Sequence, residues 1–170
     1  MTPEELLQLI QNGETSTIQF KRDVNNVTSI AQEMVAMANS KGGKILIGID
    51  DKNGEILGLN YSDIQRINNL LSTAAQDHVK SPIIISTETV RVDTKAVIVA
   101  SIPEGTDKPH TDKDGLIFIK NGSDKRKVTG REELARLLQY SGNLYAEDMI
   151  VAHSGYSDII TVEFQEFFER

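Results

Sequence analysis

The sequence contains no cysteine and no tryptophan, and only 5% of its residues are aromatic. Without cysteine the protein has no disulfide framework, no thiolate-bound zinc or iron–sulfur site and no cysteine nucleophile. The scarcity of aromatic side chains argues against a platform on which the bases of single-stranded nucleic acids stack. The lack of cysteine also suits the reducing cytoplasm, where we expect the protein to be located.

Long hydrophobic runs are lacking as well. No apolar stretch approaches the roughly 20 residues that span a bilayer, and acidic side chains stand near the N-terminus where a signal peptide has positive ones. We therefore expect a soluble protein without a membrane partner. Its 18 basic and 25 acidic residues give a formal charge of −7, which opposes attraction to phosphates over the whole surface. Any contact with nucleic acid must come from a local cluster of positive charge.

The spacing of apolar residues predicts a mixture of helices and strands. A capping box from Thr2 to Glu5 predicts a first helix, Ser62 with Gln65 predicts the start of another, and Thr129 begins a last core helix. Apolar residues at three- and four-residue spacing predict a helix over residues 27–38. Strands are predicted over residues 18–20, 44–50, 55–59, 82–92, 96–102 and 115–120. We predict an α/β (α+β) fold, a two-layer sandwich of a mixed β-sheet with helices.

The pattern changes after Gly142, where a polar, loop-like stretch begins. Phe164, Phe167 and Phe168 then follow at helical spacing, and an apolar face of this kind needs a partner surface. We assign residues 1–142 to one domain, and residues 143–170 to a linker and the start of a following element of a longer polypeptide. The phenylalanines dock on this domain, on the missing C-terminal domain, or on a second copy of the chain.

Positive charge is densest between residues 118 and 131. A hairpin tip with balancing acidic residues is one interpretation of this stretch, and a surface that contacts phosphates is the other. Lys21 and Arg22 follow a predicted strand, and Lys41 and Lys44 flank two glycines at the end of a predicted helix. The complete set of candidate nucleic-acid contacts is Lys21, Arg22, Lys41, Lys44, Lys120, Lys125, Arg126, Lys127 and Arg131.

Nucleotide-binding and hydrolase motifs are missing. The glycines around Lys41 lack the spacing of a phosphate-binding loop, and no serine stands in a nucleophile elbow. Asp50 and Asp51 follow the predicted strand over residues 44–50. An aspartate pair there is typical of a turn, although ligand and metal contacts also occur at the carboxyl ends of strands.

Four blocks in order, ETSTIQFK, ANSKGGKILIGIDD with GEILGL, DKPH and IFIKNGSDKRKVT, resemble the Schlafen/AlbA-type DNA-binding domain. The resemblance covers approximately residues 14–138. It implies an α/β fold that acts as a nucleic-acid-binding module in bacterial transcriptional regulators and helicase-like proteins. In that family an ATPase-like or winged-helix region often follows the domain.

Some animal Schlafens use the same fold as an RNA endonuclease with a carboxylate cluster. Residue by residue, Glu14 matches the first glutamate of that motif, Lys21 its lysine, and Asp50 or Asp51 its aspartate, whereas Gln19 stands where the family has a second glutamate. A neutral amide is a weaker ligand for a hard cation and cannot act as a general base. This departure from the motif favours a binding module without a cofactor over an enzyme, with magnesium or manganese expected only if the domain is nuclease-like.

Three hypotheses remain after this comparison. The leading one is a nucleic-acid-binding module, with DNA as the preferred partner, in a transcriptional regulator. The second is a nuclease that uses Glu14, Asp50 and Asp51, also the candidate metal ligands, with magnesium or manganese. The third is a protein-interaction or oligomerisation domain, with a second copy of the chain as one candidate partner, suggested by the acidity and by the phenylalanine stripe.

Overall fold

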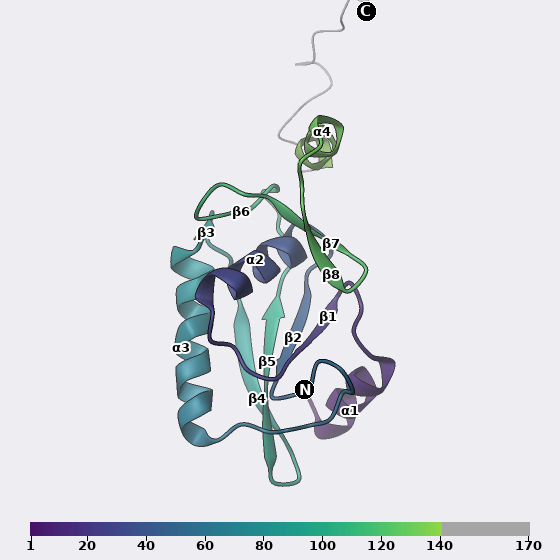
Figure 1. Ribbon diagram of the computed structural model, residues 1–170, viewed down its shortest axis with the longest axis vertical. Coiled ribbons are helices and arrows are strands. Elements are labelled where there is room, and N and C mark those ends of the chain that lie inside the picture. Colours follow the sequence, from purple (N-terminus) through teal and green to yellow (C-terminus); the bar gives the residue numbers. More distant parts are fainter. Residues whose placement is uncertain (141–170) are drawn as a thin grey trace, which may run out of the picture.

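The computed structural model describes residues 1–140, and at its centre lies a four-stranded sheet (Figure 1). In spatial order the strands are β1 (Ile18–Lys21), β2 (Gly43–Ile47), β5 (Lys95–Ile102) and β4 (Ser86–Val92). β1 runs parallel to β2, and the other neighbours are antiparallel. The mixed sheet and its helices confirm the predicted α/β sandwich.

The two central strands are apolar on both faces, because successive side chains of a strand point to opposite sides. Ile45 and Ile47 of β2 lie in one core cluster with residues of helices α2 (Val27–Ala38) and α3 (Tyr61–Asp77). Leu46 lies in the other cluster, together with Leu6 of helix α1 (Pro3–Asn12). α2 and α3 thus cover one face of the sheet, and the shorter α1 covers part of the other.

Two small strand pairs lie outside the main sheet. β3 (Val79–Lys80) pairs with β6 (Thr111–Asp112), and β7 (Phe118–Asn121) forms a hairpin with β8 (Asp124–Lys127). Helix α4 (Arg131–Tyr140) follows the hairpin and projects from the end of the molecule (Figure 1). Its predicted place in the core is wrong, because Leu134, Leu137 and Leu138 are only half-buried.

Several predicted boundaries are also wrong. Residues 55–59 make only two isolated bridges, Ile49 with Ile56 and Leu59 with Ala96, because Gly54 and Gly58 have positive φ angles of 71° and 80°. α3 begins after Asn60 instead of Ser62, since the Asn60 side chain accepts a hydrogen bond from the backbone of Asp63 at 2.9 Å. The predicted strand over residues 82–92 is regular only from Ser86 onward.

The boundary at residue 142 is untested, because Phe164, Phe167 and Phe168 lie outside the described residues. The assignment of residues 143–170 to a linker and a following element therefore stays a prediction. Within residues 1–140, none of the helices combines the length and the apolar character that a membrane crossing requires.

Candidate nucleic-acid interface

The hairpin β7–β8 is fixed to the end of α2 by the side chain of Asn39. The Asn39 amide nitrogen donates to the backbone oxygens of Phe118 and His110, each at 2.9 Å, and its oxygen accepts from the His110 backbone N–H at 2.7 Å. Ser40 adds a hydrogen bond, in which its hydroxyl oxygen accepts from the backbone N–H of Lys120 at 2.9 Å. Asn39 is buried with its polar atoms satisfied, so it positions the hairpin without leaving an unpaired group in the core.

Glu33 is the second anchor of the hairpin, and it is absent from the predicted site residues. It lies in α2 beside the buried residues Met34 and Val35, and only 6% of it is exposed. Glu33 Oε1 lies 2.7 Å from Lys120 Nζ, and Glu33 Oε2 lies 3.7 Å from Lys125 Nζ. The available signal was a glutamate directly before the apolar run from Met34 to Ala38, because a buried carboxylate requires a partner of opposite charge.

Lys120 is committed to the interior of the protein. Its ammonium group donates to Glu33, to Gln19 Oε1 at 2.9 Å, and to the backbone oxygen of Ser123. These three bonds use all three donors of a lysine, and the side chain is 1% exposed. Lys120 was predicted to contact phosphate. Its side chain instead lies beneath the hairpin, where it holds the turn against α2.

Gln19 connects Lys120 to Glu14. Its amide nitrogen donates to Glu14 Oε1, and its oxygen accepts from Lys120. An amide can do both at once, whereas an ionised carboxylate only accepts. Gln19, the neutral side chain that departs from the Schlafen nuclease motif, therefore supplies the donor that Glu14 accepts and the acceptor that Lys120 needs.

Glu14 and Asp51 both bind the open edge of β1, which has no neighbouring strand on that side among the described residues. Glu14 Oε1 accepts from the backbone N–H of Phe20 at 2.7 Å, and Asp51 Oδ1 accepts from that of Arg22 at 2.9 Å. Side-chain oxygens thus satisfy donors that an edge strand leaves unpaired.

Asp50 supports the turn after β2. It is 7% exposed, and its Oδ1 accepts from the backbone N–H groups of Lys52 and Asn53 at 2.9 and 3.3 Å. Its other oxygen binds the guanidinium of Arg22. The hydrogen bond from Arg22 is the main reason why the pKa of Asp50 lies below its ordinary value.

The carboxylates proposed as metal ligands are each engaged in these structural roles. Within the described part of the chain, no group of three or more histidine, aspartate and glutamate side chains could hold a metal ion. Glu14 and Asp51 accept from backbone N–H groups two residues apart, those of Phe20 and Arg22, and Asp50 binds the Arg22 side chain. The three predicted ligands therefore lie along the same end of β1, but they do not form a group that could hold a metal ion.

The remaining predicted cations differ in whether their side chains are exposed and in whether they already bind another residue. Arg126 pairs with Glu133 at 2.9 Å, and Lys44 donates to Ser101 Oγ at 2.9 Å on β5, away from the hairpin. Lys127 and Arg131 are exposed, and neither has an ion-pair partner among residues 1–140. Lys41 is exposed near Glu104, and its positive charge contributes to the lowered pKa of that carboxyl after the larger effect of Lys108.

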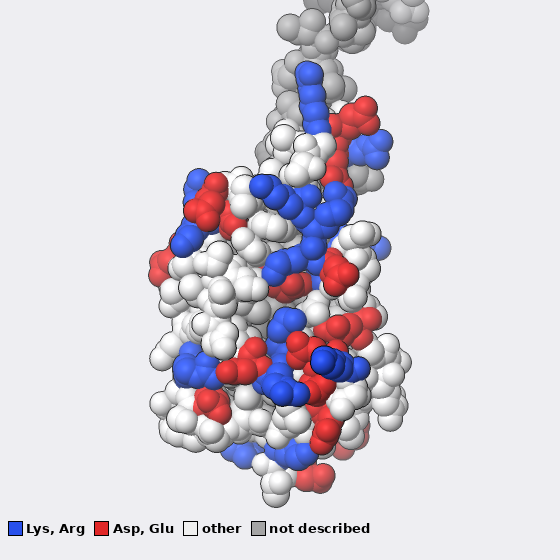
Figure 2. All heavy atoms as spheres, in the orientation of Figure 1, with Lys and Arg blue, Asp and Glu red and all other residues white. Residues whose placement is uncertain are grey.

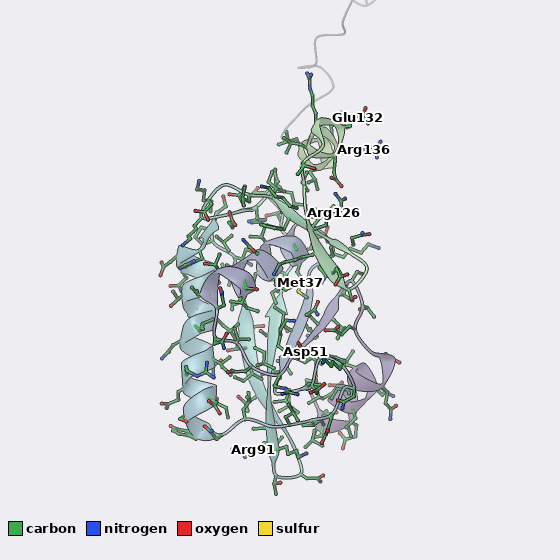
Figure 3. All side chains as sticks on the ribbon, viewed as in Figure 1. Met37, Asp51, Arg91, Arg126, Glu132 and Arg136 are labelled. Carbon is green, nitrogen blue, oxygen red and sulfur yellow. The ribbon has the colours of Figure 1, made fainter. Side chains whose placement is uncertain are left out.

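Positive side chains gather over the hairpin and the start of α4, with acidic ones interspersed (Figure 2). Figure 3 places Arg126 and Arg136 in this region, whereas Asp51 lies lower on the sheet and Arg91 lies near the opposite end of the molecule. The structure thus brings the cations of β8 and α4 to one end, whereas Arg22 binds Asp50 in the turn after β2 and Lys44 binds Ser101 on β5.

Three known proteins are similar to parts of this chain. An uncharacterized ATP-binding protein of Ureaplasma parvum is 28% identical over an alignment of 132 residues, and the match covers 71% of this chain and 37% of the relative. The chain therefore spans little more than a third of that relative's length.

The two solved structures have the same fold. The N-terminal domain of a RecG-related protein from Nitrosomonas europaea is 23% identical with a TM-score of 0.53, and the match covers 77% of this chain and 96% of that domain. The DIP2311 protein from Corynebacterium diphtheriae is 19% identical with a TM-score of 0.53, over 90% of this chain and 33% of that one.

The family comparison agrees with the motifs and with the fold. The profile described as Schlafen, AlbA_2 matches residues 14–129, which are more than half of the chain. This region contains Glu14, Gln19, Glu33, Asn39 and the whole hairpin β7–β8. The chain therefore belongs to the Schlafen AlbA_2 family.

Proposed function

We propose that this domain is a nucleic-acid-binding module, with DNA as its partner, of a larger regulatory protein. Its phosphate contacts are the cations on the outer side of the β7–β8 hairpin and on the first turn of α4. The observation that carries the proposal is the pair of exposed cations, Lys127 and Arg131, on and beside an anchored hairpin in a protein of net charge −7. Because the rest of the surface is acidic overall, binding must depend on this local patch.

The anchoring of the hairpin supports the proposal. Asn39 and Glu33 hold β7 and β8 against α2, so the cations on the outer side are displayed from a fixed support. A rigid frame lowers the entropy that binding would otherwise cost. Arg131 begins α4, where a positive charge is unfavourable to the helix dipole, so helix stability does not explain its presence.

The names of related proteins point in the same direction. The Nitrosomonas protein is named as related to the ATP-dependent DNA helicase RecG, and the Ureaplasma relative as an uncharacterized ATP-binding protein. The first name fits a domain that brings a larger protein to DNA, and both names mention ATP. The chain itself has no phosphate-binding loop spacing, so the ATP site of such a protein would lie in another part of the polypeptide.

A metal-dependent nuclease is the weaker candidate. Glu14 binds the backbone of β1, Asp50 binds Arg22, and Gln19 supplies no negative charge between them. Two or three carboxylates normally hold the magnesium or manganese of such a site.

The experiment that tests the proposal is fluorescence anisotropy with duplex DNA, single-stranded DNA and structured RNA over a salt series. We expect salt-dependent binding that is tightest for duplex DNA. The double variant Lys127→Ala/Arg131→Ala should bind more weakly and lower the slope of log K against log salt by about 0.9 for each phosphate that the protein no longer neutralises.

A second double variant is the matched control. Lys52→Ala/Arg91→Ala removes the same charge from exposed positions in the turn after β2 and in β4, and should bind like the wild type. Figure 3 places Arg91 near the opposite end of the molecule from the hairpin. Equally weakened binding in both variants, or no binding at low salt, would contradict the proposal.

A further inference from the structure

A pocket of about 130 Å³ opens between the end of β1, the first turn of α2 and strand β8. Its polar lining includes Lys21, Asn25, Asn26, Ser29, Glu33 and Lys125. Figure 2 shows basic and acidic side chains mixed between the hairpin and the middle of the molecule.

The two lysines of the pocket come from different strands, and the ion pair of each is long. Lys125 Nζ also donates to the backbone oxygen of Ser29 at 3.1 Å, but an ammonium group has three donors, so neither lysine is fully used. Lys21 Nζ lies 3.8 Å from Asp51 Oδ2, and Lys125 Nζ lies 3.7 Å from Glu33 Oε2. Charge-assisted hydrogen bonds between an ammonium and an oxygen anion are about 2.7–2.9 Å long. Both ammonium groups therefore retain the capacity to bind a closer anion.

The two carboxylates in the lining are already bound by other cations. Asp23 accepts from Arg66 at 2.6 Å, and this bond is the main cause of the lowered pKa of Asp23. Glu33 accepts from the buried ammonium of Lys120 at 2.7 Å. Neither carboxylate is left as an isolated negative charge that would repel an anion in the pocket.

The electrostatic surroundings of Lys125 also favour an anion. Burial lowers the pKa of Lys125, Glu33 opposes this effect, and the nearby positive charges of Lys21 and Lys120 lower the pKa further. An anion bound between the lysines would relieve the repulsion among these ammonium groups.

Neutral donors complete the lining. The Asn26 oxygen accepts from the backbone N–H of Ser29 at 2.9 Å, which leaves the two amide N–H donors of Asn26 for other partners. The Ser29 hydroxyl lies 3.4 Å from Lys125 Nζ and can rotate toward the pocket. Two ammonium groups, an amide and a hydroxyl form a donor set suited to phosphate oxygens.

The size of the pocket limits the ligand. Pockets that bury a drug-sized molecule have volumes of roughly 300–1,000 Å³. At about 130 Å³ this pocket is too small for a nucleoside but has room for one phosphate group. We propose that it is a phosphate-binding subsite in which Lys21 and Lys125 hold a single phosphate group from two sides. That the phosphate belongs to a nucleic acid rests on the proposed function. The existence of the subsite does not.

Inorganic phosphate is the probe for the subsite itself. In a ¹⁵N–¹H NMR titration at constant ionic strength, we expect saturable shifts of the backbone amides of Lys21, Ser29 and Lys125. The variants Lys125→Met and Lys21→Met should each weaken phosphate binding by about 10- to 100-fold, as expected for the loss of a hydrogen bond from a charged group. Arg91→Met, distant in Figure 3, is the control and should bind phosphate like the wild type. Ser29→Ala serves as a milder variant if removal of a lysine disturbs the fold.

Oligonucleotides then identify the source of the phosphate. If a 5′-phosphorylated strand binds several-fold more tightly than the same strand with a 5′-hydroxyl, the subsite holds a terminal phosphate. If both strands bind equally and Lys125→Met weakens both, it holds a phosphate of the backbone. Phosphate binding without nucleic-acid binding would leave the subsite in place and overturn the proposed function. If the Lys21 and Lys125 variants bind nucleic acid with the affinity of the wild type, and phosphate causes no amide shifts, the subsite alone is overturned.

Discussion

Gln19 is bound on both sides of its amide group, by Glu14 as acceptor and by Lys120 as donor. It is 8% exposed, so these two bonds are made where water contributes little. Glutamine satisfies both neighbours because it carries a donor and an acceptor, whereas an ionised glutamate carries only acceptors. At the scale of single residues, the departure from the Schlafen nuclease motif is therefore a structural adaptation of this site.

The variant Gln19→Glu tests that interpretation. It places a second carboxylate against Glu14, and we expect the free energy of unfolding to fall by about 1–3 kcal/mol at pH 7, because a buried hydrogen bond is replaced by repulsion between like charges. Urea unfolding measures the effect. Gln8→Glu, an exposed change on α1, is the matched control and should alter stability little.

Metal ions make the same variant informative about the nuclease hypothesis. If added magnesium or manganese restores the stability of Gln19→Glu and produces cleavage of RNA or DNA, the site is a decayed metal centre. A variant as stable as the wild type would instead show that the hydrogen bonds of the Gln19 amide contribute little to the free energy of unfolding.

The hairpin β7–β8 depends on few contacts at the scale of structural elements. It is outside the main sheet, and its side toward α2 is held by Asn39, by Phe118 in the core and by the ion pair of Lys120 with Glu33. The ion pair is almost fully buried, and removal of one member leaves an uncompensated charge. The position of the exposed cations on the outer side of the hairpin thus depends on the buried ammonium group of Lys120 on its inner side.

The variant Lys120→Met measures this dependence. We expect it to lower the free energy of unfolding by about 3–5 kcal/mol, whereas Lys120→Met combined with Glu33→Met should cost less than the sum of the two single changes. Urea unfolding gives the stabilities, and hydrogen exchange should show faster exchange in β7 and β8. Lys127→Met, exposed on the same hairpin, is the control. A Lys120→Met protein within about 0.5 kcal/mol of the wild type would contradict the anchoring role.

The whole molecule is organised around two core clusters that share the central sheet. Among the described residues, the buried members of both clusters lie between Leu6 and Phe118, and α4 adds only half-buried side chains. The hydrophobic stabilisation of the described domain therefore comes from residues that precede the predicted boundary at 142.

A fragment of residues 1–142 should accordingly fold without the rest of the chain. We expect one cooperative thermal transition with nearly the same midpoint as that of the 170-residue chain, and light scattering compares the association states of the two proteins. A fragment that loses cooperativity would show that residues 143–170 belong to the domain. A change from oligomer to monomer would support the interaction role predicted for Phe164, Phe167 and Phe168.

Local patterns in the sequence determined the main helices and the central strands. The capping box at Thr2, the apolar spacing of α2 and the continuous apolar runs of β2 and β5 each involve neighbours within a few positions, so they are recognisable without a fold. The Schlafen/AlbA motifs were recognisable for the same reason, since each is a short block of adjacent residues.

Only the tertiary structure decided which charges are available at the surface. Lys120 and Glu33 are 87 positions apart, and Lys120 and Gln19 are 101 positions apart, so no local pattern pairs them. The basic stretch over residues 118–131 was recognised from the sequence, but its division into a buried anchor, paired side chains and exposed cations was not. Hydrophobic periodicity is a property of one segment, whereas the burial and pairing of a charge depend on segments that meet only when the chain folds.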